Sequence, residues 1–371
     1  MEIPNTSGHN DDCLAAFGQS QTPVPAMDLK CVIYKSSKRV WLVVSIMTVS
    51  VLYLASHTYN WNNNVTVRHI KYQRPDVHAD VTSGSGRAKG YIEDRPGNII
   101  YPNVDISNFP TMDQVNCSGL IDDFDVAPAY SMPLIALASF PRSGNTWSRS
   151  LIQIATGYST GSVFWKEERT YKRAKNRFKA GTEDFMLRKG VCVKTHKFEE
   201  DHIAIFDHGA ILLIRNPYYS IVSEYFRFSR SYRNLTTEDI IRNMKEEDVT
   251  WENHCKRKFT KWKDTALSWI KHCKRLLVVF YENLEDNPIL ELSRMVTFLE
   301  QPIQPRRILC AVKFYSPMKG SQGHRSQLTF DPYTPEMHSI LDEFIKTVNQ
   351  TLILKNAFPL PTYQKYYLPQ E

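Results

Sequence analysis

The sequence lacks several patterns that would assign it to a common fold or site class. Its seven cysteines include no Cys-x-x-Cys pair, which argues against a structural zinc ribbon. It contains neither an internal repeat nor a heptad run, so solenoids and coiled coils are excluded. It also lacks the sequence Gly-x-x-x-x-Gly-Lys-Ser/Thr, which disfavours a kinase-type site for ATP with magnesium.

The composition of the 371 residues is that of a globular protein. Apolar residues make up 42% and charged residues 23%, a balance that argues against a largely disordered chain. Lysine and arginine number 46 against 39 acidic residues, which gives a net charge of +7. A basic protein of this kind suits an anionic ligand.

An uncharged run at 40–55 predicts a membrane anchor. Extended to Tyr59 it has about 20 residues, enough to cross a bilayer as a helix of about 30 Å. Three cations precede it directly: Lys35, Lys38 and Arg39. The positive-inside rule then predicts a cytosolic tail at 1–39, a transmembrane signal-anchor at 40–59 and a lumenal remainder, a single-pass type II protein. The short span fits the early secretory pathway, and we expect a Golgi membrane.

Two other interpretations of this run are a buried core helix and a cleaved signal peptide. A signal peptide would need an unusually long N-terminal region, and 52–55 lacks a small-x-small cleavage site. Beyond the anchor, residues 60–130 are rich in Gly, Ser, Pro, Asn and Asp, which predicts a flexible stem. A domain of ordinary size is expected at 131–360, followed by a tail at 361–371.

A lumenal location predicts glycosylation and disulfide chemistry. Four sequons follow the anchor, at Asn64, Asn116, Asn234 and Asn349. Five cysteines do so as well: Cys117, Cys192, Cys255, Cys273 and Cys310. Cys192 lies in an apolar run and is expected in the core, while Cys255 and Cys273 are the pair that we favour for a disulfide.

Residues 131–360 alternate between strand-like and helix-like segments. Short apolar runs predict strands at 134–140, 190–195, 210–214 and 276–280. Helices are expected at 146–155, 217–225 and 288–299. Buried strands separated by helices indicate a parallel sheet covered on both faces, an α/β fold.

Basic residues follow three of these strands. The first strand leads into Pro141-Arg-Ser-Gly-Asn-Thr-Trp147, the second ends in Lys194-Thr-His196, and the third in Arg215-Asn-Pro217. Because the carboxyl ends of parallel strands lie on one edge of a sheet, these segments should meet in one crevice. The alternative is that such residues are merely solvated, which holds for most single cases.

The loop after the first strand is the strongest of these motifs. Ser143, Gly144, Asn145 and Thr146 lie between a strand and a helix, where backbone N–H groups and the helix dipole can face an anion. Gly144 permits close approach of the ligand. Arg142 adds positive charge.

Three further residues fit anion binding and proton transfer. Arg215 and Ser223 lie two helical turns apart and can hold one phosphate. Neutral His196 can accept a proton from a hydroxyl, and Lys194, two residues earlier, lies on the same face of the strand. The alternatives are a structural histidine and a neutral helix serine.

These motifs resemble those of the sulfotransferase superfamily. The stretch 141–147 resembles the 5′-phosphosulfate loop, 194–196 the Lys-Thr-His segment with the catalytic base, and 215–223 the 3′-phosphate motif. Tyr281-Glu-Asn-Leu284 is also similar. Within the superfamily the sequence resembles the WSC-domain-containing, sialate O-sulfotransferase-like group at 136–147, 211–217 and 330–334. No cysteine-rich WSC module precedes the domain here, so a carbohydrate-binding role of that module is not implied.

The resemblance implies a P-loop-like α/β sandwich that uses 3′-phosphoadenylyl sulfate (PAPS) and needs no metal. It implies that 143–146 hold the 5′-phosphosulfate, that Trp147 flanks the adenine, and that Arg215 and Ser223 bind the 3′-phosphate. Arg142 stands where many members have lysine, and as a fixed charge it would act electrostatically. His196 would be the base and Lys194 a charge stabiliser. The segment 319–325 resembles a phosphate-covering loop loosely, which suggests a donor contact for Arg325.

The expected acceptor is a glycan or glycoconjugate, sialylated ones included, and no nucleic-acid signature is present. The cation-dense stretch 166–179 would guide an anionic acceptor, or is simply a solvated helix face, and 256–263 has the same ambiguity. A rival to the enzyme is a membrane-tethered binding protein that kept the fold but lost catalysis.

Overall fold

The computed structural model describes residues 98–246, 248–315 and 328–363. The predicted cytosolic tail, the anchor at 40–59, Arg325 and most of the tail at 361–371 lie outside the described residues. Within the described part, none of the helices combines the length and the apolar character that crossing a membrane requires.

A five-stranded sheet forms the centre of the fold, with the strand order β2-β3-β1-β4-β5 and every pairing parallel. Its strands are β1 (Ala136–Ser139), β2 (Gly161–Ser162), β3 (Val193–Thr195), β4 (Ala210–Ile214) and β5 (Leu276–Phe280). The four predicted strands are confirmed, and β4 and β5 have the predicted bounds. The sequence did not predict β2, whose two residues are too few to give a periodic pattern.

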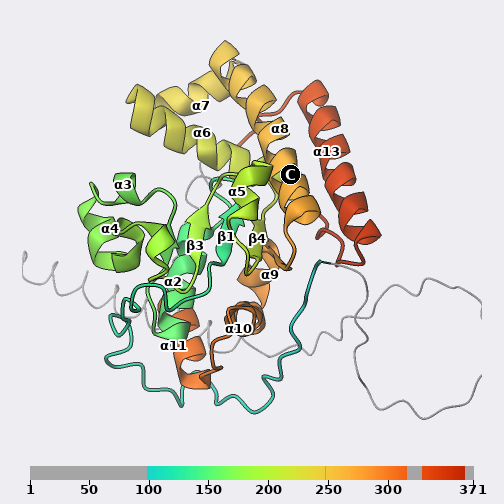
Figure 1. Cartoon of the computed structure of the whole chain (residues 1–371). Helices are drawn as coiled ribbons and strands as arrows, with labels where there is room; N and C mark the ends of the chain where they lie inside the picture. Colours follow the sequence, from blue (N-terminus) through green and yellow to red (C-terminus); the bar gives the residue numbers. More distant parts are fainter. Residues whose placement is uncertain (1–97, 247, 316–327, 364–371) are drawn as a thin grey trace, which may run out of the picture. The chain divides into compact units, whose positions relative to one another are not determined.

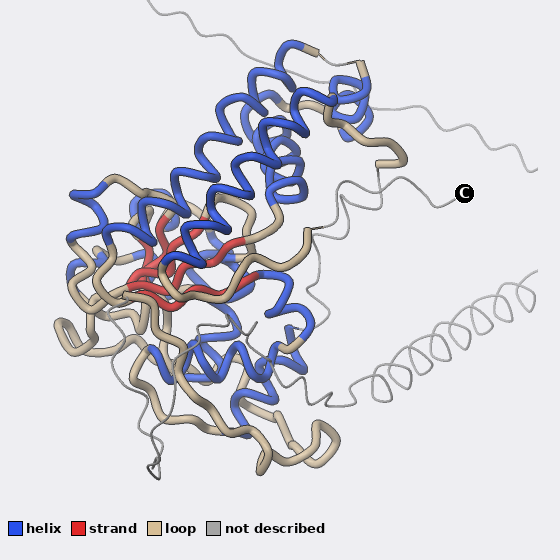
Figure 2. Tube along the Cα trace, turned by 90° about the vertical axis from the view of Figure 1, so that its right-hand side faces the viewer, coloured by secondary structure: helices blue, strands red, loops and turns tan. Residues whose placement is uncertain are grey.

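Helices cover both faces of the sheet (Figures 1 and 2). One face carries α2 (Asn145–Thr156), α10 (Pro288–Phe298) and α11 (Pro305–Tyr315). The other carries α5 (Glu200–Ala204), α6 (Pro217–Arg233), α7 (Thr237–Lys245), α8 (Val249–His272) and α13 (Pro335–Leu354). The remaining short elements are α3 (Trp165–Glu168), α4 (Lys172–Arg177), η1 (Lys179–Thr182), η2 (Phe185–Leu187) and α9 (Tyr281–Asp286).

Alternation along the strands explains the two helical layers. In β4, Ala210, Leu212 and Ile214 pack with the α6–α8–α13 side, and Ile211 and Leu213 pack with the α2–α10–α11 side. Successive strand side chains point to opposite faces, so a strand that is apolar at every position must be covered twice. The predicted parallel α/β architecture is therefore confirmed.

The register of the sheet brings the ends of three strands together. Ser139 at the end of β1 pairs with Leu213 of β4, and Ala138 pairs with Thr195 at the end of β3. The residues that follow these strands therefore leave the same edge of the sheet.

The predicted boundary of the stem at 130 is wrong, because the chain from 98 onward packs on the domain. Asn98 Nδ2 donates to the carbonyl oxygens of Ile270 and Cys273, at 2.8 and 2.6 Å. Val115 and Leu120 are buried in the core on the α2 side of the sheet. Turn-forming residues gave this stretch the composition of a linker, although a few apolar side chains fix it to the domain.

The predicted disulfide between Cys255 and Cys273 is also wrong. Both are buried free thiols, as is Cys192, which lies in the core as expected. The disulfide joins Cys117 to Cys310 instead, across a sequence separation of 193 residues. It links the 98–130 segment to α11, a partnership that sequence spacing cannot indicate.

Replacing Cys117 with serine should lower the free energy of unfolding by about 2–5 kcal/mol, because the bridge closes a long loop of the unfolded chain. Urea unfolding without reductant measures the loss. Cys273→Ser is the matched control and should leave the bridge intact. Non-reducing peptide mapping that finds Cys255 bound to Cys273 would contradict the assignment.

Candidate functional site

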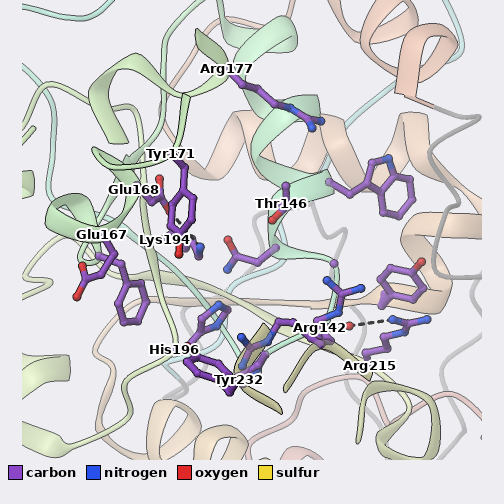
Figure 3. A pocket seen from close by; sticks show the side chains of 17 residues that line it. Arg142, Thr146, Glu167, Glu168, Tyr171, Arg177, Lys194, His196, Arg215 and Tyr232 are labelled. Atoms are coloured by element: carbon purple, nitrogen blue, oxygen red, sulfur yellow. Dashed lines mark hydrogen bonds and ion pairs between the residues drawn. The ribbon is translucent and has the colours of Figure 1, made fainter. Parts of the chain in front are cut away.

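A cavity of about 530 Å³ opens at the edge of the sheet where β1, β3 and β4 end. Most of the site residues predicted from the sequence line it: Arg142, Gly144, Asn145, Thr146, Trp147, Lys194, His196 and Arg215. Figure 3 shows Arg142 and Arg215 on one side of this pocket and Glu167, Glu168 and Tyr171 on the other. Ser143 and Ser223 are buried beside it. Arg325 lies outside the described residues.

The turn after β1 has a backbone suited to binding an anion. Arg142 and Gly144 have φ angles of 65° and 89°, and Gly144 directly precedes α2. The N–H groups of the first turn of a helix have no partner within the helix, and the dipole there favours negative charge. The turn therefore presents several amide donors to the pocket.

Only glycine fits at position 144. Its φ angle lies in the left-handed region, and an added Cβ would come within 2.6 Å of the Tyr281 ring. Tyr281 thus covers the turn closely. The hydroxyl of Ser143 beside it is buried without a hydrogen-bond partner among the described residues. A buried donor of this kind costs free energy unless an acceptor satisfies it, which fits the binding of an anion at this turn.

Two predicted residues of this turn have structural contacts. Asn145 Nδ2 donates to the carbonyl oxygen of Leu137 at 2.9 Å and to Ser139 Oγ at 3.2 Å. Trp147 Nε1 donates to the carbonyl oxygen of Tyr315 at 3.2 Å. Asn145 therefore ties the start of α2 to β1, and the Trp147 indole is fixed where it lines the pocket.

Arg142, Arg215 and Ser223 form one hydrogen-bonded group. Arg142 Nε donates to Ser223 Oγ at 3.0 Å, and Arg215 Nη1 donates to the carbonyl oxygen of Arg142 at 2.8 Å. Burial, together with the charge of Arg215, holds the pKa of Arg142 below its ordinary value. Two like-charged guanidinium groups that act on each other in one pocket favour a bound anion. The side chain of Arg142 lies with the predicted 3′-phosphate residues.

Aromatic residues hold this cationic group in place. The guanidinium of Arg215 stacks on the Tyr281 ring at 4.2 Å, and Tyr281 in turn meets Trp147 edge to face at 5.6 Å. From α8, Trp262 Nε1 donates to the carbonyl oxygen of Arg215 at 3.0 Å. The resemblance at 281–284 pointed to Tyr281 as a residue of interest. Its contact with Gly144 could not be predicted from the sequence, because the two residues are distant in the chain.

His196 has the tautomer that proton abstraction requires. Its Nδ1 lies 2.8 Å from the carbonyl oxygen of Ser139, which can only accept, so Nδ1 carries the proton. Nε2 is then left with its lone pair. Burial, and next the nearby charge of Lys194, lower the pKa of His196 to about 4. The imidazole therefore stays neutral, as a general base must.

Lys194 is held by an acidic partner that the sequence analysis did not identify. Lys194 Nζ lies 3.0 Å from Glu168 Oε1, and the buried Arg149 donates to both oxygens of Glu168, at 3.0 and 3.1 Å. The sequence analysis of the stretch 166–179 considered only its basic residues. Glu168 fixes the ammonium of Lys194 in the wall of the pocket and neutralises part of its charge.

The described residues contain no group of three or more His, Cys, Asp or Glu side chains that could hold a metal ion. Part of the stretch 166–179 does reach the pocket, through Glu167, Glu168, Tyr171 and Arg177. Arg227 and Tyr232, near the end of α6, line it too and were not predicted. Arg227 follows Ser223 by one helical turn, a spacing that could have identified it.

Comparison with known proteins assigns the family. The sulfotransferase domain model matches residues 133–329, more than half of the chain. The chain therefore belongs to the sulfotransferase domain family, which confirms the resemblance drawn from the motifs.

Among curated proteins, the chain is similar to WSCD family members. It is 35% identical to one from Aedes aegypti over 57% of this chain and 63% of the relative. It is 34% identical to one from Drosophila melanogaster over 58% of this chain and 65% of the relative. The chain thus spans less than two thirds of the length of both. A third, from Drosophila pseudoobscura pseudoobscura, is 29% identical over 81% of this chain and 93% of the relative.

Among solved structures, the chain is similar to the mouse sulfotransferase SULT7A1 complexed with PAP. The sequence identity is 20%, the coverage 67% of this chain and 94% of that one, and the TM-score 0.41.

In the donor-free protein, His196 should remain neutral down to about pH 5, because burial disfavours the imidazolium. Its depressed pKa also means that the unfolded chain takes up this proton first as the pH falls below 6.5, so this group lowers stability in acid. ¹⁵N-histidine NMR, assigned with His196→Gln, should show the Nδ1–H tautomer and a midpoint near 4. A midpoint near 6.5 would refute the assignment.

Glu168→Gln should lower the free energy of unfolding by about 3–5 kcal/mol, since it leaves the buried Arg149 without its countercharge. Glu167→Gln, at an exposed neighbour in α3, is the matched control and should change stability by less than about 0.5 kcal/mol. Denaturant unfolding compares the two. Equal effects would show that the Glu168 cluster does not stabilise the pocket wall.

Proposed function

We propose that this chain is a membrane-anchored sulfotransferase that transfers a sulfuryl group from PAPS to a hydroxyl of a glycan or glycoconjugate. The observation that carries the proposal is a single pocket in which an amide-rich turn, two arginines and a neutral imidazole converge. Family membership supports the reaction class. Sialylated acceptors fit the similarity to the WSCD group.

The two anionic ends of PAPS suit the two parts of this pocket. The turn from Ser143 to Thr146 would bind the 5′-phosphosulfate through backbone N–H groups. Arg215, Ser223 and Arg142 would bind the 3′-phosphate. Tyr281 and Trp147 offer aromatic surface between them, consistent with an adenine nearby.

His196 would act as the general base. Its Nε2 takes the proton of the acceptor hydroxyl while that oxygen forms a bond to sulfur and the bond from sulfur to the bridging phosphate oxygen breaks. The 5′-phosphate leaves with the electron pair as part of 3′-phosphoadenosine 5′-phosphate (PAP). Lys194 would stabilise charge on the sulfuryl oxygens, and its link to Glu168 fixes its position beside His196.

Two features support a lumenal catalytic domain. A disulfide between Cys117 and Cys310 is typical of an oxidising compartment. The sequon residues Asn116 and Asn234 are exposed, as glycosylation requires. Together with the predicted signal-anchor, these features make a Golgi membrane the location that we propose.

The activity is tested with ³⁵S-labelled PAPS and a panel of glycans. His196→Ala should lower kcat by about 10²–10⁴-fold while PAP affinity is kept, because the base contributes mainly to the chemical step. Arg215→Ala should weaken PAP binding by at least about 10-fold through the loss of charged hydrogen bonds.

Arg242→Ala, at an exposed residue of α7, is the control and should change neither quantity. Tight PAP binding without transfer to any acceptor would instead support the rival binding protein. Full activity of His196→Ala would exclude the proposed base.

A further inference from the structure

Part of the pocket is not used by the residues proposed for the donor. Its lining there includes Glu167, Tyr171, Arg227 and Tyr232. In Figure 3, Glu167 and Tyr171 lie across the pocket from Arg142 and Arg215. His196 lines the same pocket, so an acceptor at its Nε2 would share the cavity with these side chains.

Arg227 is held rigidly on this wall. Its Nε and Nη2 donate to the two oxygens of Glu224, both at 2.7 Å, and the Glu224 side chain is only 1% exposed. This paired geometry uses one edge of the guanidinium, and 38% of the Arg227 side chain remains exposed. The Arg227 guanidinium is thus held in one orientation before a ligand binds, which reduces the entropy lost on binding.

The group around Arg227 keeps a positive charge. Lys258 Nζ also lies 3.1 Å from Glu224 Oε1, so two cations share one carboxylate. The charge of Arg227 acts on both sides of the site, since it contributes to the lowered pKa of Arg142 and of Lys194. An anion in this part of the pocket would therefore be attracted.

Aromatic side chains at the same place suit a sugar ring. Tyr232 and Tyr171 are 71% and 65% exposed, unusually high for tyrosines that line a cavity. The Arg227 guanidinium lies 5.7 Å from the Tyr232 ring. The Tyr232 ring beside this fixed cation offers a sugar ring both stacking and charge pairing. The carboxylate of Glu167, which also lines the pocket, can accept a hydrogen bond from a sugar hydroxyl.

We propose that Arg227 binds the carboxylate of an acidic sugar in the acceptor and so selects anionic over neutral glycans. This inference rests on the proposed function, because it places the acceptor in the same pocket. The competing assignment is that Arg227 contacts PAPS, since it lies one helical turn beyond Ser223, which is proposed to bind the 3′-phosphate.

The test measures binding of three glycans to the PAP-loaded protein by saturation-transfer NMR. Sialyllactose, its methyl ester and lactose differ in the carboxylate or its sugar. Wild-type protein should bind sialyllactose at least about 10-fold more tightly than the ester, as expected for a charged hydrogen-bonded pair. In Arg227→Met this preference should fall below about 3-fold, with PAP affinity unchanged.

Arg230→Met on the same helix is the matched control, because Arg230 is exposed, contacts Thr237 and does not line the pocket. It should keep the full preference. Four results would each overturn the proposal. The wild-type protein could bind the acid and its ester equally, or Arg227→Met could keep the full preference. Arg227→Met could also bind PAP more weakly, or the wild-type protein could bind an acidic peptide more tightly than sialyllactose.

Transfer assays with the same glycans separate this proposal from the general one. Selective binding without transfer would leave the Arg227 site standing and refute the catalytic function. Transfer with equal efficiency to the acid and to its ester would support the catalytic function and refute the Arg227 site.

Discussion

The site depends on the hydrogen bond from the Arg215 guanidinium to the carbonyl oxygen of Arg142. It joins the turn after β1 to the end of β4, and the positive charge of Arg215 acts on the Arg142 guanidinium. Such a pair of cations is electrostatically costly without an anion, and the stacking of Arg215 on Tyr281 holds it in place. The parallel register of the sheet makes this contact possible, because both strands end at one edge.

The same edge of the sheet also positions His196. The carbonyl oxygen of Ser139 holds Nδ1 of His196 and thereby leaves Nε2 for chemistry. The pocket therefore combines a cationic half suited to a nucleotide with a neutral proton acceptor. Across the pocket lie Glu167, Glu168 and Tyr171. Glu168 pairs there with Lys194, and Glu224 pairs with Arg227 on α6. The two sides of the pocket thus differ in chemistry.

The sequence predicted four of the strands, the parallel sheet and eight of the residues that line the pocket, because strand-end motifs are local and the register gathers them. It did not predict Glu168 as the partner of Lys194, because that contact joins segments distant in the chain. It also missed Arg227 on the pocket wall, although the spacing of one helical turn from Ser223 was a usable signal. The disulfide between Cys117 and Cys310 was not predicted either, because its two cysteines are distant in the chain. The segment 98–130 resembled a linker because only a few of its apolar side chains reach the core.

A crystal structure of the protein with PAP would show directly whether this pocket binds the nucleotide. The proposed site predicts the 5′-phosphate on the backbone N–H groups of the turn at 143–146. It also predicts the 3′-phosphate within hydrogen-bond distance of Arg215 and Ser223, with Nε2 of His196 facing open space beside the 5′-phosphate. A nucleotide bound away from this turn, or Arg215 directed out of the pocket, would contradict it.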